Sequence, residues 1–286
     1  MAAVARTLPT PLTFGRFLVR RTFRGLESIG EQMTFHAKVL ADAVLVIPRH
    51  PAEVMRIIGD ITWGSGALIV GAGTAGVIFF MAFITGGLVG LEGFKALQLI
   101  GAESFSGFVS AFGNTREITP IIAGVTLAAQ VGAGFTAELG AMRISDEIDA
   151  LEVMAVQTRR YLVASRVVAC MIAITPLYLV SLFASYIATQ VAVVHYAGLS
   201  GGTFAHYFSL FLPPIDVLYS LIKVLVFAMA IALIHCYYGY NARGGPVGVG
   251  IAVGKAIRTS IVAINILNFA LSAVMWGIRD TVRIAG

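Results

Sequence analysis

Long stretches without a charged residue are the feature that most restricts how this chain can fold. No Asp, Glu, Lys or Arg occurs at positions 61–91, 118–137 or 167–215. A helix needs about 20 apolar residues to cross the hydrocarbon core of a bilayer, so the last stretch is too long for a single span. These stretches predict an all-α membrane protein.

Composition supports the same class. Hydrophobic residues make up 58% of the chain and charged residues only 12%, and the mean hydropathy is +0.87, whereas soluble domains carry about 25% charged residues. Basic residues near the ends of spans explain the net charge of +5 better than nucleic-acid binding does. Cys170 and Cys236 show no metal-ligand spacing, and we expect both to be packing residues.

Five spans are predicted. They cover residues 62–91, a segment that begins near Phe105, and residues 167–193, 217–240 and 259–278. A non-cytoplasmic loop is expected at 195–207 and a further loop at 241–258. The chain is therefore divided into an N-terminal tail at 1–13, an interfacial region at 14–60 and a five-span domain at 61–286.

Residues 14–46 have the pattern of an amphipathic helix. Charged residues recur three or four positions apart on one face, and apolar residues share another. The apolar face comprises Val19, Phe23, Leu26, Met33, Leu40 and Val44. This pattern predicts a helix in the membrane interface, with packing on a soluble partner as the alternative. Pro48 and Pro51 are expected to end it.

A short acidic helix is predicted at about 145–155, after the second span. Ser145 can cap it, and the helix dipole favours negative charge in its first turns. The acidic residues are Asp146, Glu147, Asp149 and Glu152, and Ile148, Leu151 and Met154 form an apolar edge beside them. A helix of this kind outside the membrane is typical of a docking element.

Lysine and arginine in the segments that flank the spans indicate orientation. They are frequent in the N-terminal region, at 141–166 and at 241–258, whereas the segment 92–104 has only Lys95 and 195–215 has none. We therefore expect the N-terminus and the acidic helix in the cytoplasm. Five spans then place the C-terminus outside, although Arg279 and Arg283 lie there.

Three ionisable residues lie inside predicted spans. Arg116 and Glu117 are near the outer part of the second, and Lys223 is the only charge between Asp216 and Arg243. An ionisable group deep in a membrane costs at least about 2.5 kcal/mol, so it is a functional candidate. Arg116 and Glu117 are neighbours and point about 100° apart on a helix, so they do not form an ideal pair with each other. Glu117 is therefore predicted to pair with Lys223 from another span. A purely structural bridge between helices is the alternative.

No enzyme motif is complete in the chain. Gly254 and Lys255 are followed by Ala256 rather than the Ser or Thr of a P-loop, no HExxH or GxSxG occurs, and the five histidines show no ligand spacing. A GxGxxG match at 71–76 lies within an apolar stretch, which favours close helix packing over dinucleotide binding. We expect no catalytic, cofactor or metal site in this chain.

The segment AELGAMRISDEIDALEVMAV, at 137–156, resembles the signature of the MlaE/YrbE permeases, the membrane subunits of lipid-transporting ABC systems that work with Mce-domain proteins. The segment HCYYGYNARGGPVGVGIAVGKAIR, at 235–258, resembles in particular the B-type YrbE subunit of actinobacterial Mce systems. The resemblance extends over about 64–277. Asp146 stands where the family motif EEIDA begins with Glu.

This resemblance implies a permease of the plasma (inner) membrane that imports lipid. It implies a heterodimer with a related A-type YrbE permease, a cytoplasmic ATPase dimer that binds ATP and Mg, and extracytoplasmic Mce-domain proteins. It also implies that Arg116, Glu117 and Lys223 border a lipid cavity between the two permeases. The acids of the 145–155 helix would meet basic groups of the ATPase, while Ile148 and Leu151 fill its groove.

Two other classes of function were considered. An ion-coupled secondary transporter would show internal symmetry and broken helices around acids at the midplane of the membrane. A membrane-embedded lipid-modifying enzyme would show a cluster of His, Asp or Ser at the interface. The sequence shows neither an internal repeat nor such a cluster.

Overall fold

A computed structural model describes residues 11–64 and 73–277, and every regular element in this part of the chain is a helix. Two helices, α1 (Pro11–Arg49) and α2 (Pro51–Trp63), precede the spans and meet between the two prolines that were predicted to break the pattern. Five further helical segments are long and apolar enough to cross a membrane. The predicted all-α fold with five spans is confirmed.

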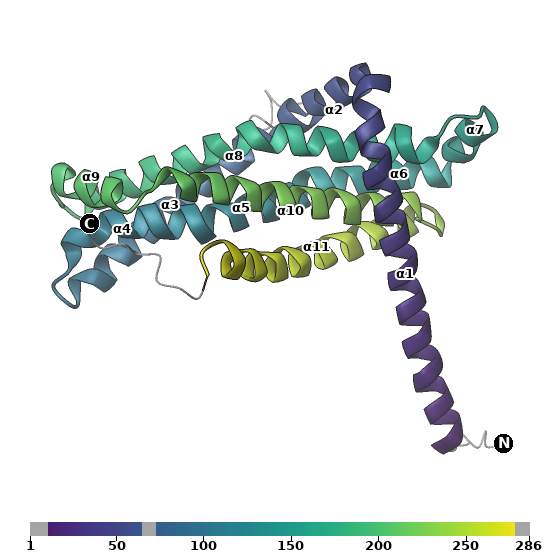
Figure 1. Cartoon of the computed structure of the whole chain (residues 1–286), viewed down its shortest axis with the longest axis horizontal. Helices are drawn as coiled ribbons and strands as arrows, with labels where there is room; N and C mark the ends of the chain where they lie inside the picture. Colours follow the sequence, from purple (N-terminus) through teal and green to yellow (C-terminus); the bar gives the residue numbers. More distant parts are fainter. Residues whose placement is uncertain (1–10, 65–72, 278–286) are drawn as a thin grey trace, which may run out of the picture.

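The five spans pack side by side as a bundle (Figure 1). The first is α3 (Gly73–Gln98). In the second, π-helical segments at Val109–Ile118 and Ala128–Gly132 join α4 (Ser106–Phe108), α5 (Thr119–Leu127) and α6 (Ala133–Ile144). The third is α8 (Ser165–Val191) with π-helical ends at Arg159–Ala164 and Ala192–Tyr196. The last two are α10 (Pro214–Tyr240) and α11 (Gly245–Met275).

Two short helices lie at opposite ends of the bundle. The acidic helix α7 (Glu147–Val153) connects the second and third spans, and α9 (Gly201–Leu210) connects the third and fourth. Figure 1 shows α7 at one end and α9 at the other. The region predicted as an outer loop at 195–207 is therefore partly helical.

Two helix boundaries also differ from the sequence prediction. Helix α3 continues to Gln98, so Glu92 and Lys95 lie on it and form an ion pair at 2.9 Å. Helix α11 begins at Gly245 rather than Thr259, and most of the predicted 241–258 loop is helical. Charged residues do not end these helices because their long side chains reach water along the helix surface. The charged residues therefore do not mark the ends of these two helices.

Helix α1 crosses the spans at the α7 end and extends past the bundle (Figure 1). Val39 and Val46 are fully buried against the protein. The three residues of the predicted apolar face whose side chains are described are exposed instead, with Met33 at 65%, Leu40 at 39% and Val44 at 76% of full exposure. An exposed apolar face on a helix that crosses the ends of the spans is the arrangement expected of a helix in the membrane interface.

The first and third spans approach closely at Gly86. A Cβ at this position would lie 2.6 Å from the carbonyl oxygen of Ser185 on α8, so glycine is required there. Cys170 and Cys236 are both free and buried, as expected of packing residues. Small side chains thus determine how closely these spans pack.

Some predicted features lie outside the described residues. Gly71 of the GxGxxG match is one of them, whereas Gly73 and Gly76 lie in the first turn of α3. Most of the predicted tail and the C-terminal Arg279 and Arg283 also lie outside the described part.

Candidate functional site

The second span carries Arg116 and Glu117 just before Pro120. Proline has no N–H, so Pro120 cannot donate the usual helical hydrogen bond to the carbonyl of Arg116, four residues earlier. Lys223 Nζ, on α10, donates to this carbonyl oxygen at 2.6 Å. Pro120 of the second span thus leaves the Arg116 carbonyl oxygen as an acceptor for Lys223 of the fourth span.

Lys223 uses all three of its N–H donors within the protein. Besides the Arg116 carbonyl, its Nζ donates to Ser272 Oγ at 2.7 Å and to Glu117 Oε2 at 3.3 Å. The predicted pairing of Glu117 with Lys223 is confirmed. The Lys223 side chain is fully buried, whereas that of Glu117 is 39% exposed. Glu117 is therefore the member of the pair that faces out of the chain.

Glu117 also accepts hydrogen bonds from the fifth span. Asn268 Nδ2 donates to Glu117 Oε2, and Ser272 Oγ donates to Oε1, each at 2.6 Å. Asn268 and Ser272 lie four residues apart, on one face of α11. Neither residue is predicted from the sequence, because uncharged polar residues in a span give only a weak signal. One carboxylate thus connects the second, fourth and fifth spans.

Arg116 forms a second buried ion pair, which the sequence analysis did not predict. Its Nε and Nη2 lie 2.8 and 2.7 Å from Asp216 Oδ2. Trp276 Nε1 donates to Asp216 Oδ1 at 2.8 Å, and the Arg116 guanidinium lies 4.1 Å from the centre of the Phe112 ring. Asp216 was overlooked because it precedes the apolar run of α10 and has the pattern of an interfacial residue.

Arg116, Glu117, Asp216 and Lys223 together form a charge cluster with no net charge. It lies at the end of the bundle opposite α7, since Asp216 is in the first turn of α10 and the last residue of that helix contacts α7. Three of its four side chains are at most 8% exposed. A polar group that approaches from outside the chain therefore meets the Glu117 carboxylate first. Direct contact with Arg116 or Lys223 would require a rearrangement.

At the other end of the bundle, α7 begins differently from the sequence prediction. Ser145 does not cap it; the cap position is Asp146, in the left-handed conformation with φ of 59°. The Ser145 hydroxyl donates to Glu147 Oε1 at 2.8 Å. Helix α7 is consequently shorter than the predicted 145–155 segment.

Two of the three residues of the predicted apolar edge, Ile148 and Leu151, face the chain's own core. Ile148 is fully buried and Leu151 is half-buried, whereas Val153 and Met154 are 88% and 66% exposed. The resemblance implied that Ile148 fills a groove in a partner protein. Because Ile148 is buried in the chain itself, it is not available for this contact. The outward apolar residues are Val153 and Met154.

The acids of α7 bond to the ends of three spans. Asp149 Oδ1 lies 2.5 Å from Arg143 Nη1 at the end of α6. Glu152 Oε1 accepts hydrogen bonds from Thr158 Oγ1 and from Tyr240 Oη on α10, each at 2.9 Å. These bonds lower the pKa of Glu152, that from Thr158 most. Movement of α7 would thus pull directly on the second, third and fourth spans.

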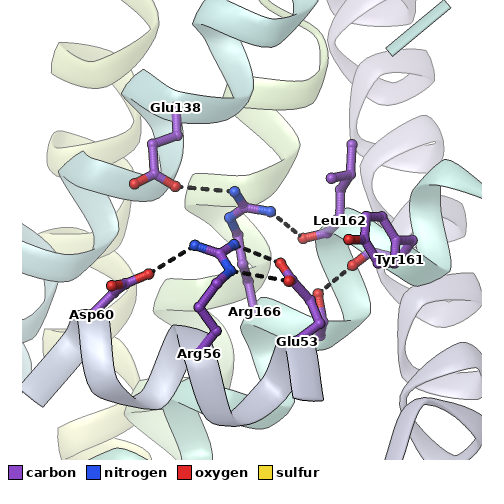
Figure 2. Close-up of polar contacts among 8 residues, drawn as sticks. Glu53, Arg56, Asp60, Glu138, Tyr161, Leu162 and Arg166 are labelled. Carbon is purple, nitrogen blue, oxygen red and sulfur yellow. Dashed lines mark hydrogen bonds and ion pairs between the residues drawn. The ribbon is translucent and has the colours of Figure 1, made fainter. Parts of the chain in front are cut away.

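A further group of charges lies around α2. Figure 2 shows Arg56 and Arg166 close together with carboxylates around them. Arg56 lies 2.6 Å from Glu53 and 2.9 Å from Asp60, and its hydrogen bonds hold the pKa of Glu53 below the usual range. Arg166, whose side chain is 5% exposed, lies 3.0 Å from Glu138 on α6. The sequence analysis had considered Arg166 only as a charge that flanks a span.

In the part of the chain that the structure describes, no three His, Cys, Asp or Glu side chains come together in a group that could hold a metal ion.

Known proteins resemble this chain over most of its length. The family model described as Permease MlaE matches residues 64–274. A probable ABC transporter permease protein of Rickettsia bellii is 30% identical over 91% of this chain and 97% of its own length. A similarly named Synechocystis protein is 35% identical over 70% of this chain and 78% of its own. The Arabidopsis thaliana protein TRIGALACTOSYLDIACYLGLYCEROL 1, chloroplastic, is 29% identical over 77% of this chain and 64% of its own. The chain is a multi-pass membrane protein that belongs to the MlaE permease family.

Proposed function

We propose that this chain is the permease subunit of an ABC transporter that moves lipids across the cell envelope. The observation that carries the proposal is the single outward carboxylate of the charge cluster, Glu117, which lies on the second span and bonds to the fourth and fifth. A molecule with one polar head and apolar chains fits such a surface. The name of the Arabidopsis relative, which is that of a galactolipid, and the ABC permease names of the bacterial relatives support this class.

The chain encloses its substrate together with a second permease. Exposed apolar side chains extend along the outer face of α3, and Glu117 is the outward member of the charge cluster. We propose that a related YrbE permease of the A type covers this side to form a heterodimer, with Arg116, Glu117 and Lys223 at the lipid cavity. This chain would be the B-type partner in an Mce system, with extracytoplasmic Mce-domain proteins continuing the path for import.

Energy enters through α7. A cytoplasmic ATPase dimer, which binds ATP and Mg, would contact the exposed acids Asp146, Glu147 and Asp149 and the apolar Val153 and Met154. Leu151 and Glu152 would connect this contact to the spans, because Glu152 bonds to Thr158 and Tyr240. In this proposal the protein lies in the plasma (inner) membrane with α1 and α7 on the cytoplasmic side and the C-terminus outside.

Lipid uptake by cells that carry variants of the charge cluster tests the cavity. Glu117→Gln preserves the size of the side chain but removes the outward charge, and we expect uptake to fall severalfold. Lys223→Ala should abolish it. Glu92→Gln is the matched control, since Glu92 is an exposed acid of the neighbouring first span. Wild-type uptake in Glu117→Gln and Lys223→Ala would refute the cavity assignment.

Co-purification tests the ATPase contact. Charge reversal at Glu147 and Asp149 should abolish co-purification of an ATPase while the protein still inserts into the membrane. The control is charge reversal at Glu92 and Glu103, which lie at the end of the bundle opposite α7. Unchanged co-purification in the Glu147 and Asp149 variant, or equal loss in the control, would refute the role of α7.

A further inference from the structure

A cavity of about 680 Å³ lies at the α7 end of the bundle, where the end of α10 and the start of α11 meet α1. Its volume is within the range of about 300–1,000 Å³ that is usual for small-molecule sites. It is separate from the charge cluster, which lies at the opposite end of α10. The proposed transport path therefore does not account for it.

Two cations line this cavity, Arg243 in the α10–α11 turn and Lys255 on α11. Both side chains are exposed. Within the described residues, neither lies within 4 Å of a carboxylate. Among the residues whose side chains the structure describes, the lining contains no acidic residue, and its other polar members include the phenol groups of Tyr237 and Tyr238. The cavity thus offers positive charge and hydrogen-bond donors to an anion.

One side of the cavity is formed by small and apolar residues of the fifth span. Ile251 lines the cavity and is 54% exposed. Further along α11, exposed apolar side chains follow at Val262, Ile266 and Phe269. A ligand with a phosphate at one end and hydrocarbon chains at the other could place the phosphate between the two cations and its chains along α11.

We propose that this basic cavity binds the phosphate headgroup of an anionic phospholipid from the membrane leaflet on the α7 side. The lipid would occupy the site as a resident ligand rather than as the transported molecule. Arg243 would bind two phosphate oxygens with its planar guanidinium, and Lys255 would supply a second positive charge. Bound there, the lipid would connect α1 to the α10–α11 turn.

Native mass spectrometry of the purified full-length chain in detergent, titrated with dioleoylphosphatidylglycerol, tests this proposal. The double variant Arg243→Gln, Lys255→Gln should bind this lipid about 30-fold more weakly, from the usual contribution of two basic residues near a membrane surface. The control variant Lys38→Gln, Arg49→Gln removes the same charge from exposed positions of α1 outside the cavity and should bind within about threefold of wild type. Exchanging the cations, as Arg243→Lys with Lys255→Arg, should retain most of the binding.

Two results would overturn the proposal. The first is equal binding of the lipid by wild type and the Gln double variant; if the variant also loses a co-purifying protein, this result would assign Arg243 and Lys255 to a protein contact. The second is competition by sn-glycerol 3-phosphate at the same concentration as the lipid, which would indicate a site for free phosphate compounds.

Discussion

The ion pair between Arg116 and Asp216 gives a quantitative test of how the second and fourth spans are held together. Asp216 accepts three hydrogen bonds, two from the Arg116 guanidinium and one from Trp276. In Asp216→Asn, the new NH₂ group must face one of these donors whichever way the amide turns. The guanidinium also loses its counterion, although its side chain is only 8% exposed. Breaking one side of such a buried pair costs about 3–5 kcal/mol.

A double-mutant cycle separates the pair from the rest of the site. Arg116→Met and Asp216→Asn should each be strongly destabilising, whereas the double variant should lose less than the sum of the two by about 2–3 kcal/mol. The free energy of unfolding is measured on the purified chain in mild detergent by titration with sodium dodecyl sulfate. In a Trp63→Phe background, Trp276 is the only tryptophan and its fluorescence reports the transition at the site itself.

Asp60→Asn is the matched control because it makes the same chemical change in an exposed pair. Asp60 and its partner Arg56 have side chains 60% and 58% exposed. A pair this exposed contributes less than about 1 kcal/mol. The reasoning is refuted if Asp216→Asn destabilises the protein no more than Asp60→Asn does, or if the two changes in the cycle are additive.

Three further predictions concern the packing of the helices. Asp42, on α1, bonds to Arg159 and Arg160. Burial raises the pKa of Asp42, but these bonds outweigh burial, and the pKa is lowered. The stabilisation of α1 by these bonds is therefore complete above the unfolded pKa of about 3.9 and is lost as the pH falls through the folded pKa. At neutral pH, Asp42→Asn should therefore speed amide hydrogen exchange in α1 about tenfold, and unchanged exchange would contradict this. Gly86→Ala should destabilise the protein by about 1–3 kcal/mol in the same detergent titration, whereas Gly59→Ala, where nothing lies within 4 Å, should be neutral or stabilising. Tyr240→Phe removes the bond to Glu152 and should reduce lipid-stimulated ATP turnover while ATPase co-purification persists; normal turnover would exclude this link.

The number of spans was predictable because membrane length and the absence of charge are properties of the sequence alone. Pairing of Glu117 with Lys223 was predictable for a related reason, since Lys223 is the only charged residue of its span after Asp216. Asp216 was not found because its place before an apolar run is equally typical of a residue in the headgroup region. Whether such a residue turns inward depends on its partner, which comes from a segment 100 positions away.

Helix α7 shows the corresponding limit for amphipathic patterns. The spacing of Ile148 and Leu151 correctly placed them on one side of the helix, but periodicity does not state what that side contacts. Ile148 packs into the chain's own core because α7 turns back on the end of α6. The same ambiguity applied to α1, where the apolar residues Met33 and Val44 face away from the protein and Asp42 faces toward it.

The missing N–H of Pro120 has a consequence for how the site can work. Lys223 is anchored to a main-chain oxygen, which no exchange of the Arg116 side chain can remove. Its positive charge therefore stays in place even if the neighbouring carboxylate swings away. If Glu117 changed partners during the proposed transport cycle, Lys223 would lose its counterion but keep two hydrogen-bond acceptors, the Arg116 carbonyl and Ser272 Oγ.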